Sequence, residues 1–321
     1  MRKVIPNLNE AAALLRQENR FLILSHRRPD GDTAGSSAAL CRALRALGKE
    51  AWILENPELT PRCVPFWTGL TSTGIPDGAV PVSVDVSSPD MLPGTAESLA
   101  AGIRLCLDHH PSNPGYAELS VICPEFAAAG ELIYELLRVL EIPLDPETGL
   151  ALYLAVSTDT GGFRYSNVTE HTFRVAADCC AAGADIFPLN RTFFTLRSPA
   201  RIRLESHLGS TMEFLSGGRV GICTLSLADM AQAGATEDDI DDLSGFTRSV
   251  EGVEIGITLR DLADGTGKIS VRTSEAYDAA AICGRLGGGG HRAAAGATVP
   301  GGIPGARAAV MQVLSELGLT E

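Results

Sequence analysis

Short apolar runs alternate with segments of helical periodicity over the first 190 residues of the chain. Runs typical of buried strands occupy residues 21–25, 51–55, 80–85 and 103–108. Apolar positions at helical spacing occupy residues 9–19, 35–47, 127–140, 147–158 and 170–182. Strands that alternate with helices in this way predict an α/β fold with a doubly wound, mostly parallel sheet.

The pattern changes after residue 190. Segment 191–207 carries four arginines against a single acid, and we predict an interdomain linker helix whose arginines either face solvent or line a cleft. The rest of the chain predicts strands at 219–226, 250–260 and 268–273 and helices at 278–286 and 304–317. We therefore expect a first domain over 1–190, a linker helix over 191–212 and a smaller α+β domain over 213–321.

Side chains that can bind metal follow the predicted strands and one predicted helix. The segment SHRRPDGD follows the apolar run 21–24, and the further candidates come after the later elements: His26, Asp30, Asp32, Asp85, Asp108, His109, His110 and Asp159. Parallel strands present their carboxyl ends at one edge of a sheet, so we expect these side chains to converge. The alternative is a set of independent turns, with Asp32 or Thr33 as the N-cap of the next helix.

The chemistry of this set favours a metal site with two cations. Imidazole and carboxylate together suit Mn²⁺, Fe²⁺ or Zn²⁺. Four carboxylates gathered in one place would repel each other, and their pKa values would rise without a counter-charge. Two divalent cations would neutralise Asp30, Asp32, Asp85 and Asp159. We therefore predict a dinuclear site.

Composition narrows the range of partners. The net charge of −13 argues against tight binding to long nucleic acid, which needs clustered Lys and Arg, but it allows short anionic ligands. The eight cysteines include no CxxC pair, so we expect buried free thiols and a reducing, cytoplasmic location. No run approaches 18 apolar residues, so we expect neither a membrane span nor a signal peptide.

A glycine-rich segment, residues 287–290, precedes His291 and Arg292 near the end of the chain. Exposed N–H groups of such a segment can approach and bind a phosphate, and the two following side chains add positive charge. The alternative is a tight turn between a helix and a strand. The spacing Gly288-x-Gly290-x-x-Ala293 also resembles a dinucleotide-binding fingerprint, but the residues before it read as helix and not as strand.

Five motifs resemble those of one protein family. SHRRPDGD, VDVSS, LDHHPSN and STDTGGFRYSN are similar to the four motifs of the DHH phosphoesterase superfamily. The segment GRLGGGGHRAAAG is similar to the glycine-rich signature of the DHH-associated domain. The motifs occur in order between residues 22 and 297, and the two-domain layout is similar to that of the RecJ-like bacterial nanoRNase/pAp phosphatases. Family II inorganic pyrophosphatases carry a different second domain.

The resemblance implies a role for each matched residue. The first Mn²⁺ would be bound by His26, Asp30 and Asp85. The second would be bound by Asp32, Asp85, His109 and Asp159, with Asp85 bridging the two. Asp108 and His110 would be catalytic, Asp108 by orienting an imidazole and His110 by facing the scissile phosphate, although the assignment of the adjacent histidines stays open. The substrate would be bound by Arg272, Gly289, Gly290 and His291, with Arg164 as a further phosphate-binding candidate.

The resemblance also implies an activity. It indicates a Mn²⁺-dependent phosphoesterase that hydrolyses nanoRNA of two to five residues to mononucleotides and 3′-phosphoadenosine 5′-phosphate (pAp) to AMP, by means of a hydroxide that bridges the two metals. Its partners would be short oligoribonucleotides, nucleoside bisphosphates or cyclic dinucleotides, and a homodimer is compatible with the family. One alternative is a stand-alone phosphodiesterase for cyclic dinucleotides such as c-di-AMP. The other is an inactive nucleotide-binding regulator, although every expected ligand position holds a competent residue.

Overall fold

The chain divides into two compact units, each built on its own six-stranded sheet. The computed structural model describes residues 5–240 and 243–320. The first unit ends at Leu196 and the second begins at Arg197. The limits expected from the sequence stay predictions: a first domain that ends at residue 190, a linker helix over 191–212 and a second domain that begins at residue 213.

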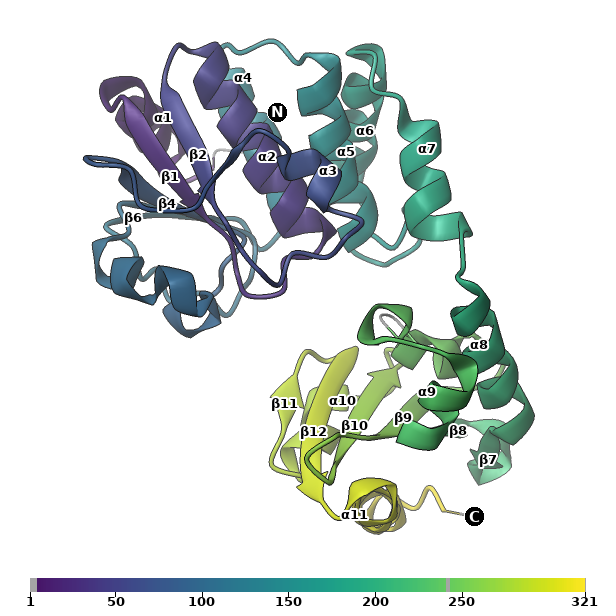
Figure 1. The fold of residues 1–321 in the computed structure, drawn as a ribbon. Helices are drawn as coiled ribbons and strands as arrows, with labels where there is room; N and C mark the ends of the chain where they lie inside the picture. Colours follow the sequence, from purple (N-terminus) through teal and green to yellow (C-terminus); the bar gives the residue numbers. More distant parts are fainter. Residues whose placement is uncertain (1–4, 241–242, 321) are drawn as a thin grey trace. The chain divides into compact units, whose positions relative to one another are not determined.

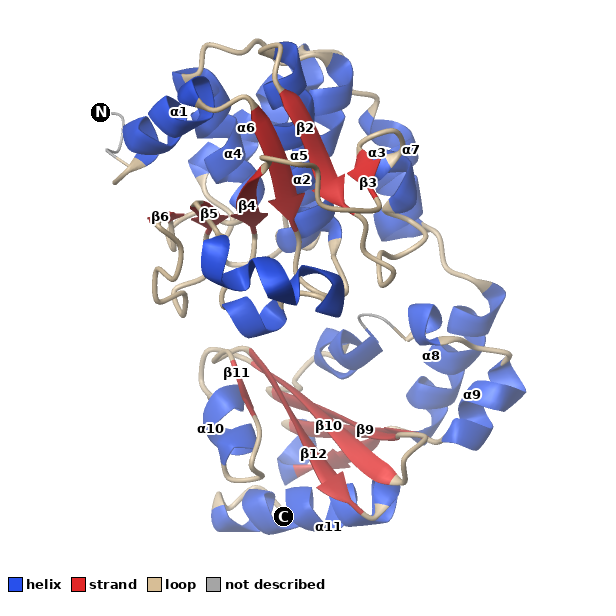
Figure 2. Cartoon of the chain, turned by 60° about the vertical axis from the view of Figure 1, so that its left-hand side comes forward, coloured by secondary structure: helices blue, strands red, loops and turns tan. Residues whose placement is uncertain are grey.

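The first unit contains a parallel sheet (Figures 1 and 2). Its strands are β1 (Arg20–Leu24), β2 (Glu50–Leu54), β3 (Thr71–Ser72), β4 (Val80–Val84), β5 (Leu105–Asp108) and β6 (Leu119–Ile122). Their order across the sheet is β3-β2-β1-β4-β5-β6, and every neighbouring pair is parallel. The predicted α/β class with a parallel sheet is confirmed. The two short edge strands β3 and β6 were not predicted.

Both faces of this sheet are buried, because successive side chains of a strand point to opposite faces. Phe21 and Ile23 of β1 join the core formed with the long helices, whereas Leu22 and Leu24 pack against the helical turns around residues 89–102. The helices of this unit are α1 (Leu8–Gln17), α2 (Gly31–Ala46), α3 (Val64–Trp67), α4 (Ala129–Val139), α5 (Pro146–Asp159), α6 (Glu170–Ala181) and α7 (Ile186–Asn190). The helical turns are η1 (Pro89–Met91), η2 (Gly94–Gly102) and η3 (Arg191–Thr195).

Helix α2 begins four residues earlier than its apolar pattern predicted. The side chain of Asp30 accepts a hydrogen bond from the backbone N–H of Thr33 at 3.0 Å, so Asp30 is the N-cap. The alternative interpretation, with Asp32 or Thr33 as the N-cap, is therefore wrong. Asp32 instead lies in the first turn, where the helix dipole favours a carboxylate. The start of α2 thus holds two acids beside the end of β1.

Glycine allows α2 to pack closely against α5. A Cβ atom added to Gly35 would lie 2.3 Å from the carbonyl oxygen of Ala151, and one added to Gly31 would lie 2.4 Å from the hydroxyl oxygen of Thr158. Glycine inside a helix costs roughly 0.5–1 kcal/mol relative to alanine, so the close approach outweighs that cost here. The packing brings the start of α2 next to the end of α5, which carries Asp159.

We expect Gly35→Ala to destabilise the protein, although alanine favours helices. Overpacking against a backbone oxygen costs about 1–3 kcal/mol. For a unit of this size, that corresponds to a decrease in Tm of about 2–12 °C, measurable by calorimetry. Gly94→Ala is the matched control, because a Cβ atom at Gly94 meets open space within 4 Å. Equal Tm values for both variants would contradict this packing.

The second unit is a mixed sheet with helices, as the predicted α+β class requires. Its strands are β7 (Glu213–Leu215), β8 (Val220–Leu225), β9 (Ile255–Asp261), β10 (Thr266–Thr273), β11 (Gly289–Gly290) and β12 (Ala294–Pro300), in the order β11-β12-β10-β9-β8-β7. Among the strand pairs that the structure describes in this sheet, β8 and β9 are parallel and the others are antiparallel. The helices are α8 (Pro199–Thr211), α9 (Leu227–Ala233), α10 (Ala279–Gly284) and α11 (Gly302–Glu316), with turns η4 (Ser216–Gly218), η5 (Glu237–Asp239) and η6 (Leu243–Ser249).

Two cores stabilise this unit. Helices α10 and α11 pack with β8, β9, β10 and β12, and α8 and α9 pack together against Cys223 and Leu225 of β8. The sequence did not predict β7, β12 or α9. It placed the start of the strand now seen as β9 at residue 250, five residues too early. Strand β12 is rich in alanine and glycine, which have low strand propensity, and pairing along β10 compensates for this.

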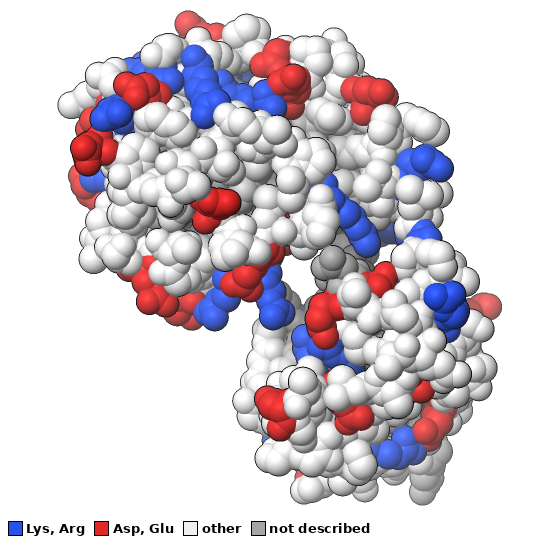
Figure 3. All heavy atoms as spheres, in the orientation of Figure 1, with Lys and Arg blue, Asp and Glu red and all other residues white. Residues whose placement is uncertain are grey.

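Several surface arginines are paired with acids. Arg20 lies 3.1 Å from Glu50, and Arg307 lies 2.6 Å from Glu213. On the face drawn in Figure 3, Lys and Arg side chains are interspersed with Asp and Glu. Such mixing is unlike the continuous basic stripe of proteins that bind long nucleic acid. That this protein does not bind long nucleic acid stays a prediction. Within the described ranges, 5–240 and 243–320, no helix is long and apolar enough to cross a membrane.

Candidate metal centre

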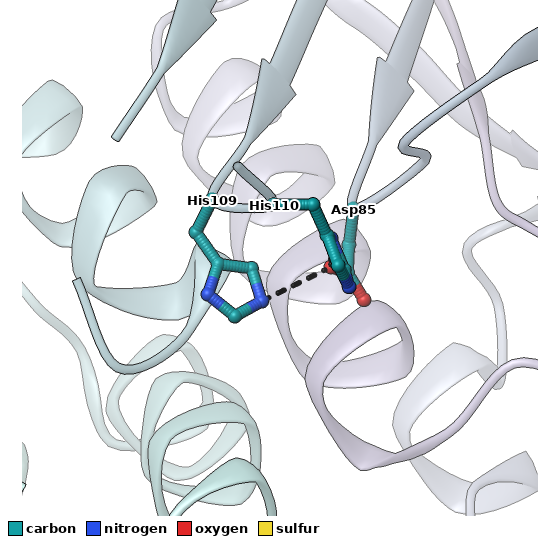
Figure 4. A group of neighbouring side chains, drawn as sticks. All are labelled: Asp85, His109 and His110. Atoms are coloured by element: carbon teal, nitrogen blue, oxygen red, sulfur yellow. Dashed lines mark ion pairs between the residues drawn. The ribbon is translucent and has the colours of Figure 1, made fainter. Parts of the chain in front are cut away.

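Candidate ligands follow the carboxyl ends of three neighbouring strands in the first unit. His26 lies two residues beyond the end of β1, Asp85 directly follows β4, and Asp108 is the last residue of β5. Strands β1, β4 and β5 are adjacent in the parallel sheet, so their carboxyl ends meet at one edge. Figure 4 shows Asp85, His109 and His110 gathered at this edge.

The predicted metal ligands come together in groups small enough to hold a cation. In each group, one nitrogen or carboxylate oxygen per residue lies within 4.8 Å of the others. The groups are His26–Asp30–Asp85, Asp32–His109–Asp159 and Asp85–His109–His110. Asp85 and His109 each belong to two groups, so the three groups form one continuous centre. The structure thus brings together all six predicted ligands, while their metal-binding roles stay predictions.

Distances within the centre fit a divalent cation. The Nε2 atom of His109 lies 3.6 Å from a carboxylate oxygen of each of Asp32, Asp85 and Asp159. The Nε2 atom of His26 lies 3.8 Å from Asp85 Oδ2. Atoms bound about 2.1 Å from one cation lie about 3 to 3.5 Å from each other. These pairs are therefore too far apart for good hydrogen bonds and close to the spacing of shared ligands.

The surroundings of one carboxylate oxygen of Asp85 also favour a bound cation. Asp85 Oδ2 accepts a hydrogen bond from the Thr33 hydroxyl at 2.5 Å. Oδ1 is buried and accepts no hydrogen bond from any residue that the structure describes. Its neighbours are the ring nitrogens of His109 and His110, at 3.6 and 3.5 Å. A buried carboxylate oxygen without a hydrogen bond is costly, and a cation would satisfy it.

Asp85 also has an unusual backbone conformation. Its φ of 58° lies in the left-handed region, which aspartate tolerates better than most residues. Such conformations cost roughly 1–3 kcal/mol and cluster at functional sites. The chain thus leaves β4 by a strained turn at the residue shared between two of the groups.

Several carboxyls of this centre have raised pKa values, first because they are buried and then because they lie near one another. Burial raises the pKa of Asp85 well above its usual range, and the neighbouring Asp32 and Asp30 raise it further. Burial also raises the pKa of Asp32. The pKa of Asp159 rises to about 9, mainly because of burial and then because of the same two neighbours. Divalent cations would restore the charged state of these carboxyls.

Asp108 holds His110 rather than facing the centre. Its Oδ1 accepts hydrogen bonds from the backbone N–H of His109 and from Nδ1 of His110, both at 2.8 Å. Its Oδ2 accepts one from the Asn113 amide at 2.7 Å. Burial opposes the ionised form, but the His110 and Asn113 hydrogen bonds outweigh it and lower the pKa of Asp108. The hydrogen bond with Asp108 in turn raises the pKa of His110. His110 is thus fixed as an imidazole that favours its protonated form.

The family of the chain follows from sequence comparison. Residues 20–158 match the DHH family, N-terminal domain, and residues 219–317 match the DHHA1 domain. The bifunctional oligoribonuclease and PAP phosphatase NrnA of Thermus thermophilus is 34% identical over 293 residues, which cover 91% of this chain and 87% of that relative. The chain belongs to the DHH family. NrnA of Bacillus subtilis is a more distant DHH relative, 23% identical over 87% of this chain and 89% of its own length.

A solved structure agrees with the DHH fold. The crystal structure of an exopolyphosphatase-related protein from Bacteroides fragilis has a TM-score of 0.86, with 22% identity and 98% coverage of both chains. The resemblance inferred from the five motifs and the predicted class of enzyme, a hydrolase of phosphoester bonds, are both confirmed. DHH phosphoesterases are divalent-metal enzymes, and the Asp and His groups at the sheet edge are the candidate sites for those cations.

The DHHA1 domain carries most of the predicted substrate-binding residues. Arg272 lies in β10, where Nη1 donates to the carbonyl oxygen of Val271 at 3.2 Å. Gly289 and Gly290 form β11, and the backbone of His291 exchanges hydrogen bonds with Ala294. A Cβ atom at Gly290, where φ is 145°, would lie 2.6 Å from Ala295 Cα, so this glycine permits close pairing of β11 with β12. Gly290 therefore has a structural role, whereas a Cβ atom at Gly289 would meet nothing within 4 Å, and the phosphate-binding role of both glycines stays a prediction.

Arg164 lies in the first unit, unlike the other predicted substrate ligands. It follows α5, and its Nε donates to the carbonyl oxygen of Gly161 at 2.5 Å. Its side chain lies five residues beyond Asp159 in an exposed position. Its phosphate-binding role also stays a prediction.

Several residues that hydrogen-bond to the candidate ligands or to Asp108 were not predicted from the sequence. Thr33 hydrogen-bonds Asp85, Asn113 hydrogen-bonds Asp108, and Ser36 donates to Asp32 at 2.8 Å. Asn113 lies inside the motif LDHHPSN, so its place in that motif was an available signal. Glu131 of α4 is fully buried near the centre, but a single acid in a helical pattern gives no such signal.

Proposed function

We propose that this protein is a Mn²⁺-dependent phosphoesterase that hydrolyses nanoRNA of two to five residues to mononucleotides and pAp to AMP. The observation that carries the proposal is the convergence of four acids and three histidines at one sheet edge, with Asp85 shared between two groups. The printed names of the Thermus and Bacillus relatives, oligoribonuclease and PAP phosphatase, support the substrate class. Residues 1–190 would form the catalytic domain and 213–321 the substrate-binding domain.

Two Mn²⁺ ions would be held in this centre. Three residues, His26, Asp30 and Asp85, would bind the first. The second would be bound by Asp32, Asp85, His109 and Asp159, with Asp85 shared. When bound, divalent cations lower the pKa of a coordinated water and neutralise charge on a phosphoryl group. His109 suits the ligand role because its Nε2 faces three carboxylates, whereas His110 is held by Asp108.

His110 would assist departure of the leaving group. Its hydrogen bond to Asp108 fixes the ring and favours the protonated form. A protonated imidazole beside the scissile phosphate can stabilise its negative charge or donate a proton to the leaving oxygen. Asp108 would act as a positioning residue, because it touches the two adjacent histidines and Asn113.

Arg272 would bind the substrate without taking part in bond cleavage. We expect Arg272→Ala to raise KM more than it lowers kcat, because a group that grips substrate and transition state equally affects mainly KM. Loss of a charge-assisted hydrogen bond costs about 1.5–3 kcal/mol, so the increase in KM should be about 10- to 150-fold. Steady-state kinetics with pAp measures both constants. Arg285→Ala is the control, because Arg285 pairs with Glu316 in the same domain. An unchanged KM for Arg272→Ala would remove it from the substrate site.

A competition assay tests the proposed function. Purified protein with Mn²⁺ receives an equimolar mixture of pApA, pAp and c-di-AMP, and a metal-free sample and Asp85→Ala serve as blanks. We expect rapid formation of AMP from pApA and pAp. Loss of c-di-AMP first, with pApA accumulating, would contradict the proposal and favour the cyclic dinucleotide phosphodiesterase. No turnover of any of the three would also contradict it and favour the inactive regulator.

A further inference from the structure

The backbone of one short segment contacts two of the candidate ligands. Residues 126–130, which include the first two residues of α4, are termed the support segment. The carbonyl oxygen of Phe126 lies 3.2 Å from Nδ1 of His109. The backbone N–H groups of Ala129 and Gly130 donate to the Asp32 carboxylate at 2.7 and 3.0 Å. The support segment therefore fixes one imidazole and one carboxylate of the centre at once.

A third candidate ligand is tied to the same segment through Asn167. The Asn167 side-chain amide donates to the carbonyl oxygen of Ala127 at 3.2 Å and to that of Asp159 at 3.1 Å. The amide therefore links the support segment to the end of α5. All three members of the group Asp32–His109–Asp159 are thus tied to the support segment, two of them directly and Asp159 through Asn167.

Two side chains anchor the support segment. Glu131 is fully buried, and its Oε2 accepts a hydrogen bond from the backbone N–H of Ala127 at 3.2 Å. The ring of Phe126 stacks on His171, with centroids 4.9 Å apart and planes inclined by 18°. His171 is half-buried. The segment is therefore held at its backbone and at its aromatic side chain.

The burial of Glu131 is more than capping of a helix requires. Asp229 occupies the equivalent third position of α9 and accepts the backbone N–H of Ser226 at 2.8 Å, yet its side chain remains 25% exposed. Complete burial of a carboxyl group costs free energy, so the interactions that Glu131 makes at this position must offset that cost. Glu131 itself belongs to none of the candidate cation-binding groups among the described residues.

We propose that Glu131 is a positioning residue that holds the support segment, and through it His109 and Asp32, in the geometry that binds the metal. The inference rests on the proposed metal-dependent function. A carbonyl oxygen at Nδ1 fixes the tautomer and orientation of a metal-binding histidine, so that Nε2 faces the cation. Glu131 would act by accepting one backbone hydrogen bond, and glutamine at this position would do the same through its amide oxygen.

The test compares Glu131→Ala, Glu131→Gln and Asp229→Ala in the full chain. Mn²⁺ affinity is measured without turnover, from the electron paramagnetic resonance signal of free Mn²⁺, and Tm is measured on the metal-free proteins. We expect Glu131→Ala to weaken Mn²⁺ binding about 10- to 100-fold, the usual cost of losing a group that orients a ligand. Glu131→Gln should bind Mn²⁺ almost as well as the natural protein. Asp229→Ala should lose Tm without losing affinity.

A second variant keeps the proposal testable if Glu131→Ala does not fold. Asn167 is exposed, so Asn167→Ala should fold, and we expect it to weaken Mn²⁺ binding in the same direction. The proposal would be overturned if Glu131→Ala and Asn167→Ala both bound Mn²⁺ as tightly as the unmutated protein. It would also be overturned if Glu131→Gln bound Mn²⁺ as weakly as Glu131→Ala. Failure of the natural protein to bind Mn²⁺ at all would instead contradict the proposed function.

Discussion

Asp85→Ala should abolish both turnover and tight Mn²⁺ binding. Asp85 is the residue shared by two of the groups, so both cations would lose a ligand. Its removal would also open the buried position where Oδ1 faces two histidines. Metal ions contribute several kcal/mol of charge stabilisation, so we expect kcat/KM for pAp to fall by more than about 10³-fold. Steady-state kinetics with added Mn²⁺ measures the loss.

The matched control for this variant is Asp90→Ala. Asp90 is an exposed acid only five residues along the chain and belongs to none of the groups that could hold a cation in the described part of the protein. We expect Asp90→Ala to retain natural activity and Mn²⁺ affinity. Mn²⁺-dependent hydrolysis that survives in Asp85→Ala would contradict the dinuclear assignment.

Removing metal should lower the stability of the protein at neutral pH. A ligand that binds only the folded state stabilises it by about 2.7 kcal/mol at a concentration 100 times its Kd. For a unit of this size, that corresponds to a gain in Tm of about 5–11 °C. We therefore expect Tm to fall by that amount when EDTA is added and to recover with Mn²⁺. Asp85→Ala should show no such response, and a natural protein indifferent to EDTA would contradict the metal centre.

The response to metal should increase with pH. The pKa of Asp159 is raised to about 9 in the folded protein, mainly by burial, whereas that of an unfolded aspartate is about 3.9. A raised pKa means that its contribution to stability is fully present below about pH 4 and is lost as the pH rises toward 9. Cations favour the ionised carboxyls, so the Mn²⁺-induced gain in Tm should be larger at about pH 8 than at about pH 6. Calorimetry at the two pH values checks the sign.

The clustering of the candidate metal ligands could be predicted from the sequence because several of these residues lie at strand ends. His26, Asp85 and Asp108 each follow a recognisable apolar run, and topology alone brings such positions together. The start of α2 was predicted less well, since its first turn, Gly31 to Ala34, lacks an apolar stripe and depends on the Asp30 cap. The hydrogen bond between the Asp30 side chain and the backbone N–H of Thr33 therefore sets the start of α2, which the periodicity of apolar residues does not show.

The parts that could not be predicted depend on contacts between distant residues. Strand β12 consists largely of small residues and is a strand because β10 and β11 pair with it on both sides. In the sequence, Glu131 is an ordinary acid in a helical pattern, whereas in the fold it is fully buried and accepts a hydrogen bond from the backbone N–H of Ala127. Gly289 and Gly290, which we predict to bind substrate, have no side-chain functional group, so that role stays a prediction.

Anomalous scattering at the manganese edge from crystals of this protein grown with Mn²⁺ tests the central claim most directly. We predict two peaks in the first unit, one in contact with His26, Asp30 and Asp85 and the other in contact with Asp32, His109 and Asp159. Asp85 should contact both peaks. No peak at this sheet edge, or strong peaks held only by other residues, would contradict the account.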